Sequence, residues 1–328
     1  MDEKTEKAIL EIFFPFWADR KESIINRKGR FVHYTSAESA LKIIQSKCLW
    51  MRNAKCMNDY SELLYGYHLL GRFFNERGPG NEFIKTVDNH KNGISKAAII
   101  QYHDWWNGIQ TNTFISAISE HDPAEDFHGR LSMWRAYGQN SAKAAIVFNL
   151  PFDNPNFLKG SNLILRPAAY FSEKELSDEI IQVITNIKNN AELISSWGME
   201  IFQACVFLLL LLNTICLKHK GFLEEREWRV IHLPRHMANL PKHIIPKTIE
   251  SKIEIVNGVP QNIYQMPLEE KAADSKVGTE LNQVIDKVII GPTQYPYPIF
   301  DAFVSELQKY GIKDAASRVI VSGIPLRT

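Results

Sequence analysis

The segment Phe31-Val32-His33-Tyr34-Thr35-Ser36-Ala37-Glu38 contains the first clear change of secondary structure in the chain. Residues 31–34 are mostly apolar or aromatic, as is typical of a short strand. Thr35 and Glu38 stand three residues apart, which is the spacing of a capping box that begins a helix. We therefore predict a strand that runs directly into a helix, with polar side chains at the junction.

Further short strands alternate with helices along the rest of the chain. The chain's Asn257-Gly258 pair lies between two strand-like runs and predicts a hairpin. A strand, a helix and a strand over about 286–321 predict a β-α-β unit. Because the strands are short, scattered and partly paired in hairpins, we predict an α+β domain with a mixed β-sheet. The other predicted strands lie at 49–51, 113–119, 144–148 and 225–231.

Two helical regions lie outside this pattern. Residues 1–30 are predicted as an N-terminal helical segment, which Pro15 should kink or split. Residues from about 174 to 219 are predicted as a helical insertion in a single domain that spans 31–328. Its apolar run, Ile201 to Leu217, is shorter than the roughly 20 residues that a membrane span needs. We therefore predict a core helix and no membrane association.

Composition excludes several classes of protein. The chain has 328 residues, 45% of them hydrophobic, and its 38 basic and 37 acidic residues leave a net charge of +1. This is the balance of a soluble globular protein and not of one that coats DNA. The four cysteines form no CxxC pair, which argues against a zinc ribbon or a disulfide scaffold. The charged N-terminus has no apolar signal-peptide core, so we predict a cytoplasmic location.

Polar residues gather at His33-Tyr34-Thr35, where the predicted strand meets the predicted helix. A histidine there can donate a hydrogen bond to a ligand hydroxyl, and a helix N-terminus favours a phosphate. The alternative is that His33 only fixes the end of the strand.

A second group begins with Ser116 on a predicted strand and continues through Trp134, Arg135 and Tyr137. An aromatic turn that carries an arginine can stack on a flat ring and pair with a phosphate. Alternatively, Trp134 and Tyr137 are core anchors and Arg135 is a salt-bridge partner.

A third group lies on the predicted strand 225–231. Glu225, Glu227 and Arg229 share one face of a strand because side chains alternate with period two. That face is either solvated or lines a polar cleft, while Trp228 and Val230 supply the core face. The acidic loop His121–His128 can in principle hold a metal ion, although a flexible acidic loop is the simpler interpretation.

Short motifs spread over about 31–327 give the chain a family resemblance. They read HYTS (33–36), LW…N…MNDxxE (49–62), FISxxSE (114–120), LSMWRxYG (131–138), ExEWR (225–229), VIIGP (288–292) and SxIPxR (322–327). As a set they resemble a bacterial family of domains of unknown function. That family in turn resembles the toxin-type enzymes of the ADP-ribosyltransferase superfamily. The resemblance implies a split mixed β-sheet with helical insertions that clamps NAD in a bent shape.

The same resemblance implies catalytic roles for two carboxylates. Cleavage of the nicotinamide–ribose bond passes through an oxocarbenium-like state, as in glycoside cleavage. Glu227 is expected to stabilise that cation, and Glu225 is expected to support it or to act as a base on the acceptor.

The residues expected to bind NAD come from the first two groups. His33 would hold the adenosine ribose with Thr35 beside it, Tyr137 or Trp134 would stack on the nicotinamide, and Arg135 would meet the pyrophosphate. Tyr34 is an alternative for the aromatic position. The expected set of cofactor-binding residues is His33, Tyr34, Thr35, Ser116, Trp134, Arg135 and Tyr137.

These observations lead to an expected function and two alternatives. The leading expectation is an ADP-ribosyltransferase that uses NAD as substrate, needs no metal and modifies RNA, DNA or protein, as a toxin or an anti-phage effector. An antitoxin or chaperone would then be a partner. The alternatives are a non-catalytic module that binds a nucleotide or a phage component, and a metal-dependent nuclease built on the loop His121–His128.

Overall fold

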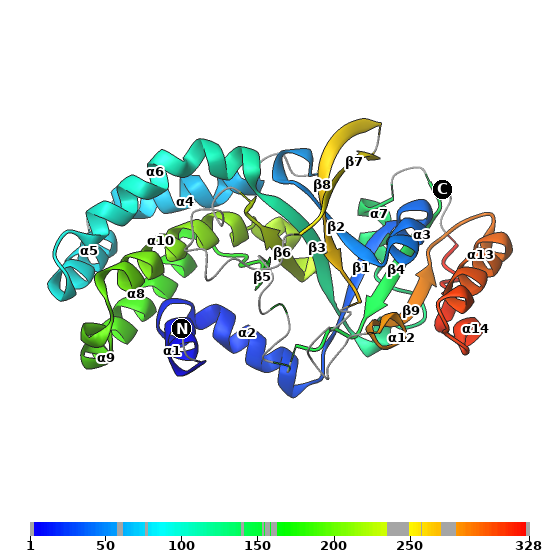
Figure 1. Cartoon of the computed structure of the whole chain (residues 1–328), viewed down its shortest axis with the longest axis horizontal. Helices are drawn as coiled ribbons and strands as arrows, with labels where there is room; N and C mark the ends of the chain where they lie inside the picture. Colours follow the sequence, from blue (N-terminus) through cyan, green and yellow to red (C-terminus); the bar gives the residue numbers. More distant parts are fainter. Residues whose placement is uncertain are drawn as a thin grey trace.

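The strands form one mixed sheet (Figure 1) in the computed structural model, which describes residues 3–57, 62–75, 78–138, 141–152, 154, 158, 163–234, 249–256, 258–269 and 280–325. The order along the sheet is β10-β9-β4-β1-β3-β2-β8-β7, and β6 pairs with both β3 and β5. Strands β9 and β10 are parallel, and the other pairs are antiparallel. The prediction of a mixed sheet is therefore confirmed. The strands are β1 (Arg30–Ser36), β2 (Cys48–Asn53), β3 (Phe114–His121), β4 (Lys143–Phe148), β5 (Leu163–Pro167), β6 (Glu227–His232), β7 (Ser251–Val256), β8 (Val259–Pro267), β9 (Ile285–Ile290) and β10 (Val319–Val321).

The sheet divides between β1 and β3. These strands pair only over Arg30–Val32, opposite Ser119–His121, whereas β1 pairs with β4 as far as Ser36. Beyond that point β3 pairs with β6 along residues 114–119 and with β2 at its first two residues. The second half of β1 and the first half of β3 therefore border a gap in the sheet.

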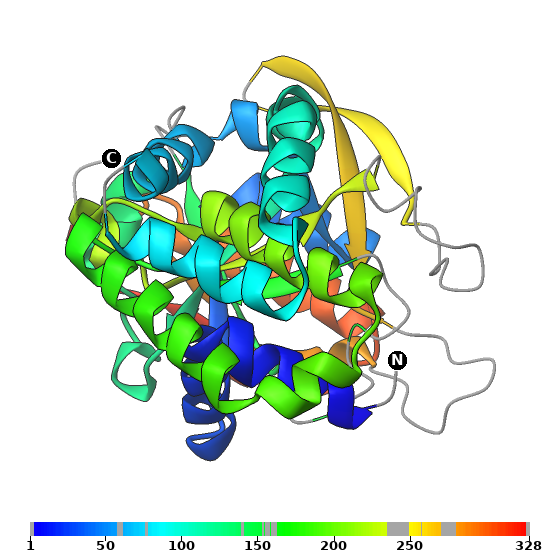
Figure 2. The same cartoon turned by 90° about the vertical axis from the view of Figure 1, so that its left-hand side faces the viewer.

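Helices lie on both sides of this divided sheet. Figure 1 shows α4, α5, α6, α8 and α10 gathered on one side, with α3, α13 and α14 near the opposite end, and Figure 2 shows the helical side face on. The helices are α1 (Glu3–Phe13), α2 (Pro15–Asn26), α3 (Ala37–Ser46), α4 (Glu62–Asn75), α5 (Pro79–His90), α6 (Ile94–Asn112), α7 (Leu131–Ala136), α8 (Glu173–Asn189), α9 (Ala191–Ser196), α10 (Met199–Cys216), α12 (Leu281–Val284), α13 (Pro296–Lys309) and α14 (Ala315–Arg318), with short 3-10 turns η1 (Ala54–Cys56), η2 (Pro123–Glu125) and η3 (Lys220–Glu225).

The apolar helix α10 belongs to the core of the helical layer. It packs against α4 and α6, and its side chains join one continuous buried cluster. Among the described residues, α10 alone is long and apolar enough to cross a membrane by length and composition, and 61% of it is buried. This burial agrees with the predicted core helix of a soluble protein.

Several local predictions are confirmed. Pro15 divides the N-terminal segment, because α1 ends at Phe13 and α2 begins at Pro15, where its missing N–H costs no helical hydrogen bond. The hairpin forms between β7 and β8, and Gly258 adopts φ +78° in its turn. The β-α-β unit consists of β9, α13 and β10.

Other local predictions need correction. The cap of α3 is Ser36, whose hydroxyl accepts from Ser39 N, so the predicted capping box at Thr35 and Glu38 does not form. The helical insertion is three helices (α8, α9 and α10), and α5 is a helix that we did not predict. Strand β6 begins at Glu227, because residues up to Glu225 form the turn η3. The motif residues 58, 59, 326 and 327 lie outside the described residues.

Candidate functional site

A cavity of about 720 Å³ occupies the gap where β1 and β3 diverge. Its walls come from β1, the start of α3, β2, β3, the loop after α7, η3, β6 and the hairpin β7–β8. The volume lies within the range of small-molecule sites, about 300–1,000 Å³. Seven of the nine predicted site residues line this cavity, namely His33, Tyr34, Thr35, Ser116, Tyr137, Glu225 and Glu227.

His33 enters the wall from the half of β1 that has left β3. Its Nδ1 lies 2.8 Å from the carbonyl oxygen of Ala117 on β3. A carbonyl only accepts, so Nδ1 carries the proton and Nε2 of the neutral ring is an acceptor. Burial lowers the pKa of His33 more than this hydrogen bond raises it. The ring is therefore neutral at pH 7 and accepts a hydrogen bond from a ligand hydroxyl, the reverse of the donation that we predicted.

Glu227 lies at the start of β6, and only 3% of its surface is exposed. Its Oε1 accepts from Arg229 Nε at 2.9 Å, and its Oε2 accepts from Lys218 Nζ at 2.5 Å. Burial raises the pKa of Glu227, but the charges of Arg229 and Lys218 lower it by more. Glu227 is therefore an ionised carboxylate at neutral pH. Each oxygen has a second lone pair, so the carboxylate can accept further hydrogen bonds from a ligand.

Glu225 lies before strand β6 and pairs with Lys218, which also pairs with Glu227. Arg226 has φ +44°, which turns the chain between η3 and β6. Oε2 of Glu225 accepts from Lys218 Nζ at 2.7 Å, while no described residue hydrogen-bonds its Oε1. The side chain of Lys218 is 5% exposed, so one buried ammonium joins two carboxylates in the cavity wall.

Tyr34 lines the cavity, but its hydroxyl is already used. It accepts from Arg130 N at 2.8 Å, and the ring packs edge to face on Trp134 with 4.8 Å between centroids. Burial raises the pKa of Tyr34 to about 12. This tyrosine is therefore fixed as part of the core behind the cavity.

The structure does not bring Trp134 or Arg135 to the cavity. Trp134 is 1% exposed, and its Nε1 donates to the carbonyl of His128 at 2.7 Å. The indole packs so close to Gly129 and Gly291 that a Cβ at either glycine would approach it within 3.0 Å. Arg135 is exposed on α7. The predicted nicotinamide contact of Trp134 and pyrophosphate contact of Arg135 are therefore corrected, because one side chain fills the core and the other points to solvent.

Ser116 is the least satisfied polar group in the cavity wall. The residue is 3% exposed, and its Oγ has no hydrogen-bond partner in the described part of the chain. A buried hydroxyl without a partner costs free energy, so a bound ligand that offers a polar atom would recover that cost.

Three further wall residues were missed by sequence reasoning. Lys218 directly follows the apolar run that ends at Leu217. Trp50 and Arg52 lie on β2, inside a motif that we had quoted but to which we assigned no role. A lysine immediately after a long apolar run is a signal that could have been used, because such a charge needs a partner.

The acidic loop after β3 forms ion pairs with neighbouring cations. Asp126 pairs with Arg30 and Lys287, each at 2.9 Å, and Glu125 receives two hydrogen bonds from Arg130. In the described part of the chain no cluster of three histidine, cysteine or acidic residues is placed to hold a metal ion. The loop is thus an ordered charge network.

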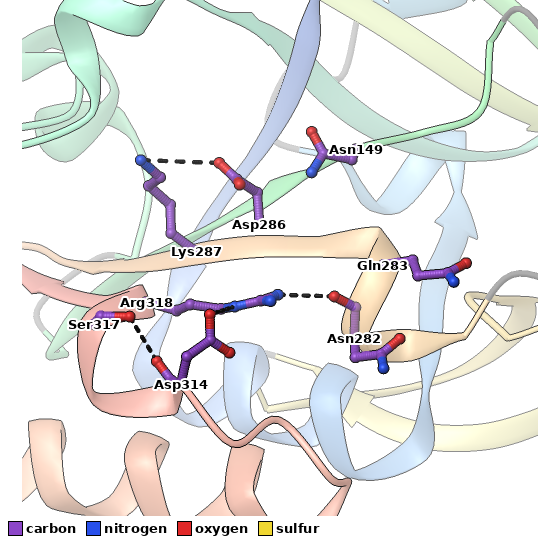
Figure 3. Close-up of a pocket in the computed structure, with 8 residues that line it drawn as sticks. All are labelled: Asn149, Asn282, Gln283, Asp286, Lys287, Asp314, Ser317 and Arg318. Carbon is purple, nitrogen blue, oxygen red and sulfur yellow. Dashed lines mark hydrogen bonds and ion pairs between the residues drawn. The ribbon is translucent and has the colours of Figure 1, made fainter.

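A second, polar recess of about 450 Å³ lies beside α12, β9 and α14 (Figure 3). Arg318 donates to Asp314 and to the carbonyls of Asn282 and Ile285. Asp286 pairs with Arg30 and Lys287. The charged groups of this recess therefore neutralise one another, and none of the described residues that line it is aromatic.

Comparison with known proteins gives one match. Residues 133–230 match a family described as "Protein of unknown function (DUF2971)". The matched stretch contains five of the predicted site residues, namely Trp134, Arg135, Tyr137, Glu225 and Glu227. No curated protein and no solved structure matches the chain. The match supports the predicted resemblance to a family of domains of unknown function.

Proposed function

We propose that this chain is an ADP-ribosyltransferase that takes NAD as substrate and modifies a nucleic acid or a protein. The observation that carries the proposal is a single cavity lined by both His33 and Glu227. One is a neutral hydrogen-bond acceptor and the other is an ionised carboxylate, and they come from strands on opposite sides of the gap in the sheet.

The proposed reaction needs a fixed negative charge next to the ribose. The bond between the ribose C1′ and the nicotinamide nitrogen breaks, its electron pair leaves with nicotinamide, and C1′ gains cationic character. Glu227 would lie beside that centre and stabilise it, and a preorganised charge of this kind is worth about 100- to 1,000-fold in rate. Arg229 and Lys218 hold the carboxylate in place, so little reorganisation is needed.

The remaining cavity residues have proposed roles in binding and proton transfer. Nε2 of His33 would accept from an adenosine ribose hydroxyl, with Thr35 beside it. Tyr137 would stack on nicotinamide in place of Trp134. The acceptor's nucleophile attacks C1′ and loses a proton, which Oε1 of Glu225 would take.

The direct test uses the purified full chain, NAD labelled in its adenylate half, and cell lysate. We expect nicotinamide release together with a labelled macromolecule, and digestion with nuclease or protease identifies the acceptor class. Glu227→Gln should reduce nicotinamide release by about 100-fold or more. Glu120→Gln is the matched control, because Glu120 is also a buried glutamate between cations but does not line the cavity. A folded wild-type chain that releases no nicotinamide in any lysate contradicts the proposal.

A second candidate is a module that binds a nucleotide without cleaving it. The observation that favours it is that both oxygens of Glu227 already accept from a cation, which weakens the field they offer to a ribose cation. Binding of NAD without nicotinamide release, even with lysate present, would select this function. A nuclease would be recognised by cleavage of nucleic acid that EDTA abolishes. As an ADP-ribosyltransferase, the chain would act as a toxin or an anti-phage effector.

A further inference from the structure

The start of α3 has little capacity left for an anion. Ala37 N donates at 2.7 Å to a carbonyl oxygen in the loop before β4, and Ser39 N donates to Ser36 Oγ at 3.1 Å. The ammonium of Lys42, one turn further along, pairs with Glu38 at 2.8 Å. Because these donors have partners, an anion in the cavity needs a different donor.

Arg52 on β2 is such a donor. Its guanidinium is fixed by two neutral acceptors, since Nε donates to Gln261 Oε1 at 3.1 Å and Nη2 donates to the Cys56 carbonyl at 2.6 Å. A guanidinium has five N–H groups, so three remain for a ligand. Burial lowers the pKa of Arg52, which reflects a charge held partly away from water.

The surroundings of Arg52, which is partly buried, differ from those of Arg229 and Arg166. Arg229 pairs with Glu227 at 2.9 Å, and Arg166, which has no carboxylate partner among the described residues, lies 3.6 Å from the ring centre of Trp17. In the part of the chain that the structure describes, Arg52 has neither a carboxylate nor an aromatic ring as partner. Buried charges are usually paired, so a partly buried guanidinium without either partner is a candidate to bind an anion.

We propose that Arg52 binds the phosphate groups of the nucleotide that occupies the cavity, the role that the sequence had assigned to Arg135. A guanidinium whose orientation is fixed can bind two phosphate oxygens side by side. Ser116, whose hydroxyl has no partner among the described residues, lines the same cavity as Arg52. The ligand class is a nucleoside diphosphate, and where this ligand is NAD the inference rests on the proposed function.

The experiment measures binding of ADP, ADP-ribose and adenosine to the full chain by calorimetry. For Arg52→Ala we expect affinity for ADP and ADP-ribose to fall by about 10- to 100-fold, the worth of a paired charged hydrogen bond. Adenosine, which has no phosphate, should bind equally to both proteins. Arg52→Lys keeps the charge but loses the planar guanidinium that can bind two oxygens at once. Its affinity for ADP and ADP-ribose should therefore lie between those of the wild-type chain and Arg52→Ala. Lys174→Ala removes an exposed positive charge on α8 and is the control for net charge.

Each outcome has a clear meaning. Equal binding of ADP by the wild-type chain and Arg52→Ala overturns the inference, and so does a loss in Arg135→Ala alone or a wild-type chain that binds no phosphate compound. If Arg52→Ala does not fold, a folded Arg52→Gln variant gives the same comparison. ADP binding that depends on Arg52, without nicotinamide release from NAD, supports this inference and rejects the enzymatic proposal. Undiminished NAD cleavage by Arg52→Ala supports the enzymatic proposal and rejects the role of Arg52 in binding the phosphates.

Discussion

Glu120 and Glu227 lie next to each other on the paired strands β3 and β6, but on opposite faces. Glu227 is opposite Ser119, and Glu120 N donates to the carbonyl just before Glu227. Both residues are less than 5% exposed, and both carboxylates pair with two cations. In each case the partners lower the pKa of the carboxyl below its usual value, against the effect of burial. For Glu120 these are the Trp228 hydrogen bond and the two arginines, and for Glu227 they are Arg229 and Lys218.

The difference lies in what each glutamate connects. Glu120 accepts from Trp228 Nε1 at 2.8 Å and pairs with Arg20 and Arg27, so it ties α2 to the sheet. The partners of Glu227 come from its own strand and from the turn after α10, and its carboxylate lines a cavity. Burial, ion pairing and a shifted pKa are therefore shared by a structural carboxylate and a candidate catalytic one. The open space beside Glu227 is what separates them.

The largest expected effect separates the two glutamates by activity. The rate of nicotinamide release should fall by about 100-fold or more in Glu227→Gln, since one preorganised charge contributes a factor of that size. Glu120→Gln should keep most of the wild-type rate at temperatures below its unfolding temperature. Initial rates at saturating NAD, with circular dichroism to verify folding, measure this difference. Equal losses in two folded variants would show that Glu227 has no special role.

The next effect concerns stability. Glu120→Ala removes the acceptor shared by two arginines and an indole, and we expect a loss of about 2–3 kcal/mol, as for a hydrogen bond to a charged group. The figure stays modest because the side chains of Arg20 and Arg27 are 38% and 45% exposed and can turn to water. Urea denaturation measures the free energy of unfolding. A change below about 0.5 kcal/mol, the usual range for surface substitutions, would mean that α2 is not tied to the sheet through this residue.

Much of the fold could be predicted from sequence because its signals are local. The hairpin between β7 and β8, the division at Pro15 and the apolar run of α10 each follow from signals in neighbouring residues only. The prediction of a capping box at Thr35 was wrong because Thr35 and Ser36 are both suitable N-cap residues, and the backbone conformation determines which of them caps the helix.

The site was partly predictable for a different reason. His33 and Glu227 share a cavity because β1 and β6 both border β3, and that register depends on pairing between strands far apart in the chain. Trp134 was misplaced because a six-residue helix does not reveal which face is buried. Arg52 was overlooked because its importance depends on which residues a distant strand supplies as partners.

A third prediction uses pH to test the two sides of the cavity. Protonation of His33 turns its Nε2 from an acceptor into a donor, so ligand affinity should be constant above pH 6.5 and fall in more acidic solution. The folded pKa is lower than the unfolded value, so stability also decreases as the pH drops below 6.5. Glu227 keeps its charge through this range because its pKa is lowered from 4.5. Calorimetry at several pH values measures the affinity, and His33→Gln should remove the acidic decrease; a decrease that persists would assign it to another group.

The smallest expected effect concerns Ser116. Because its hydroxyl is buried without a partner, Ser116→Ala should leave the free energy of unfolding unchanged or raise it by up to about 1 kcal/mol. If the hydroxyl serves a ligand, the same change should weaken nucleotide binding by about 5- to 10-fold, as for one neutral hydrogen bond. Ser119→Ala is the matched comparison, because Ser119 is a second buried serine on β3 that lines the same cavity. A loss of stability without a loss of binding would identify Ser116 as a packing residue and leave Arg52 to hold the phosphates alone.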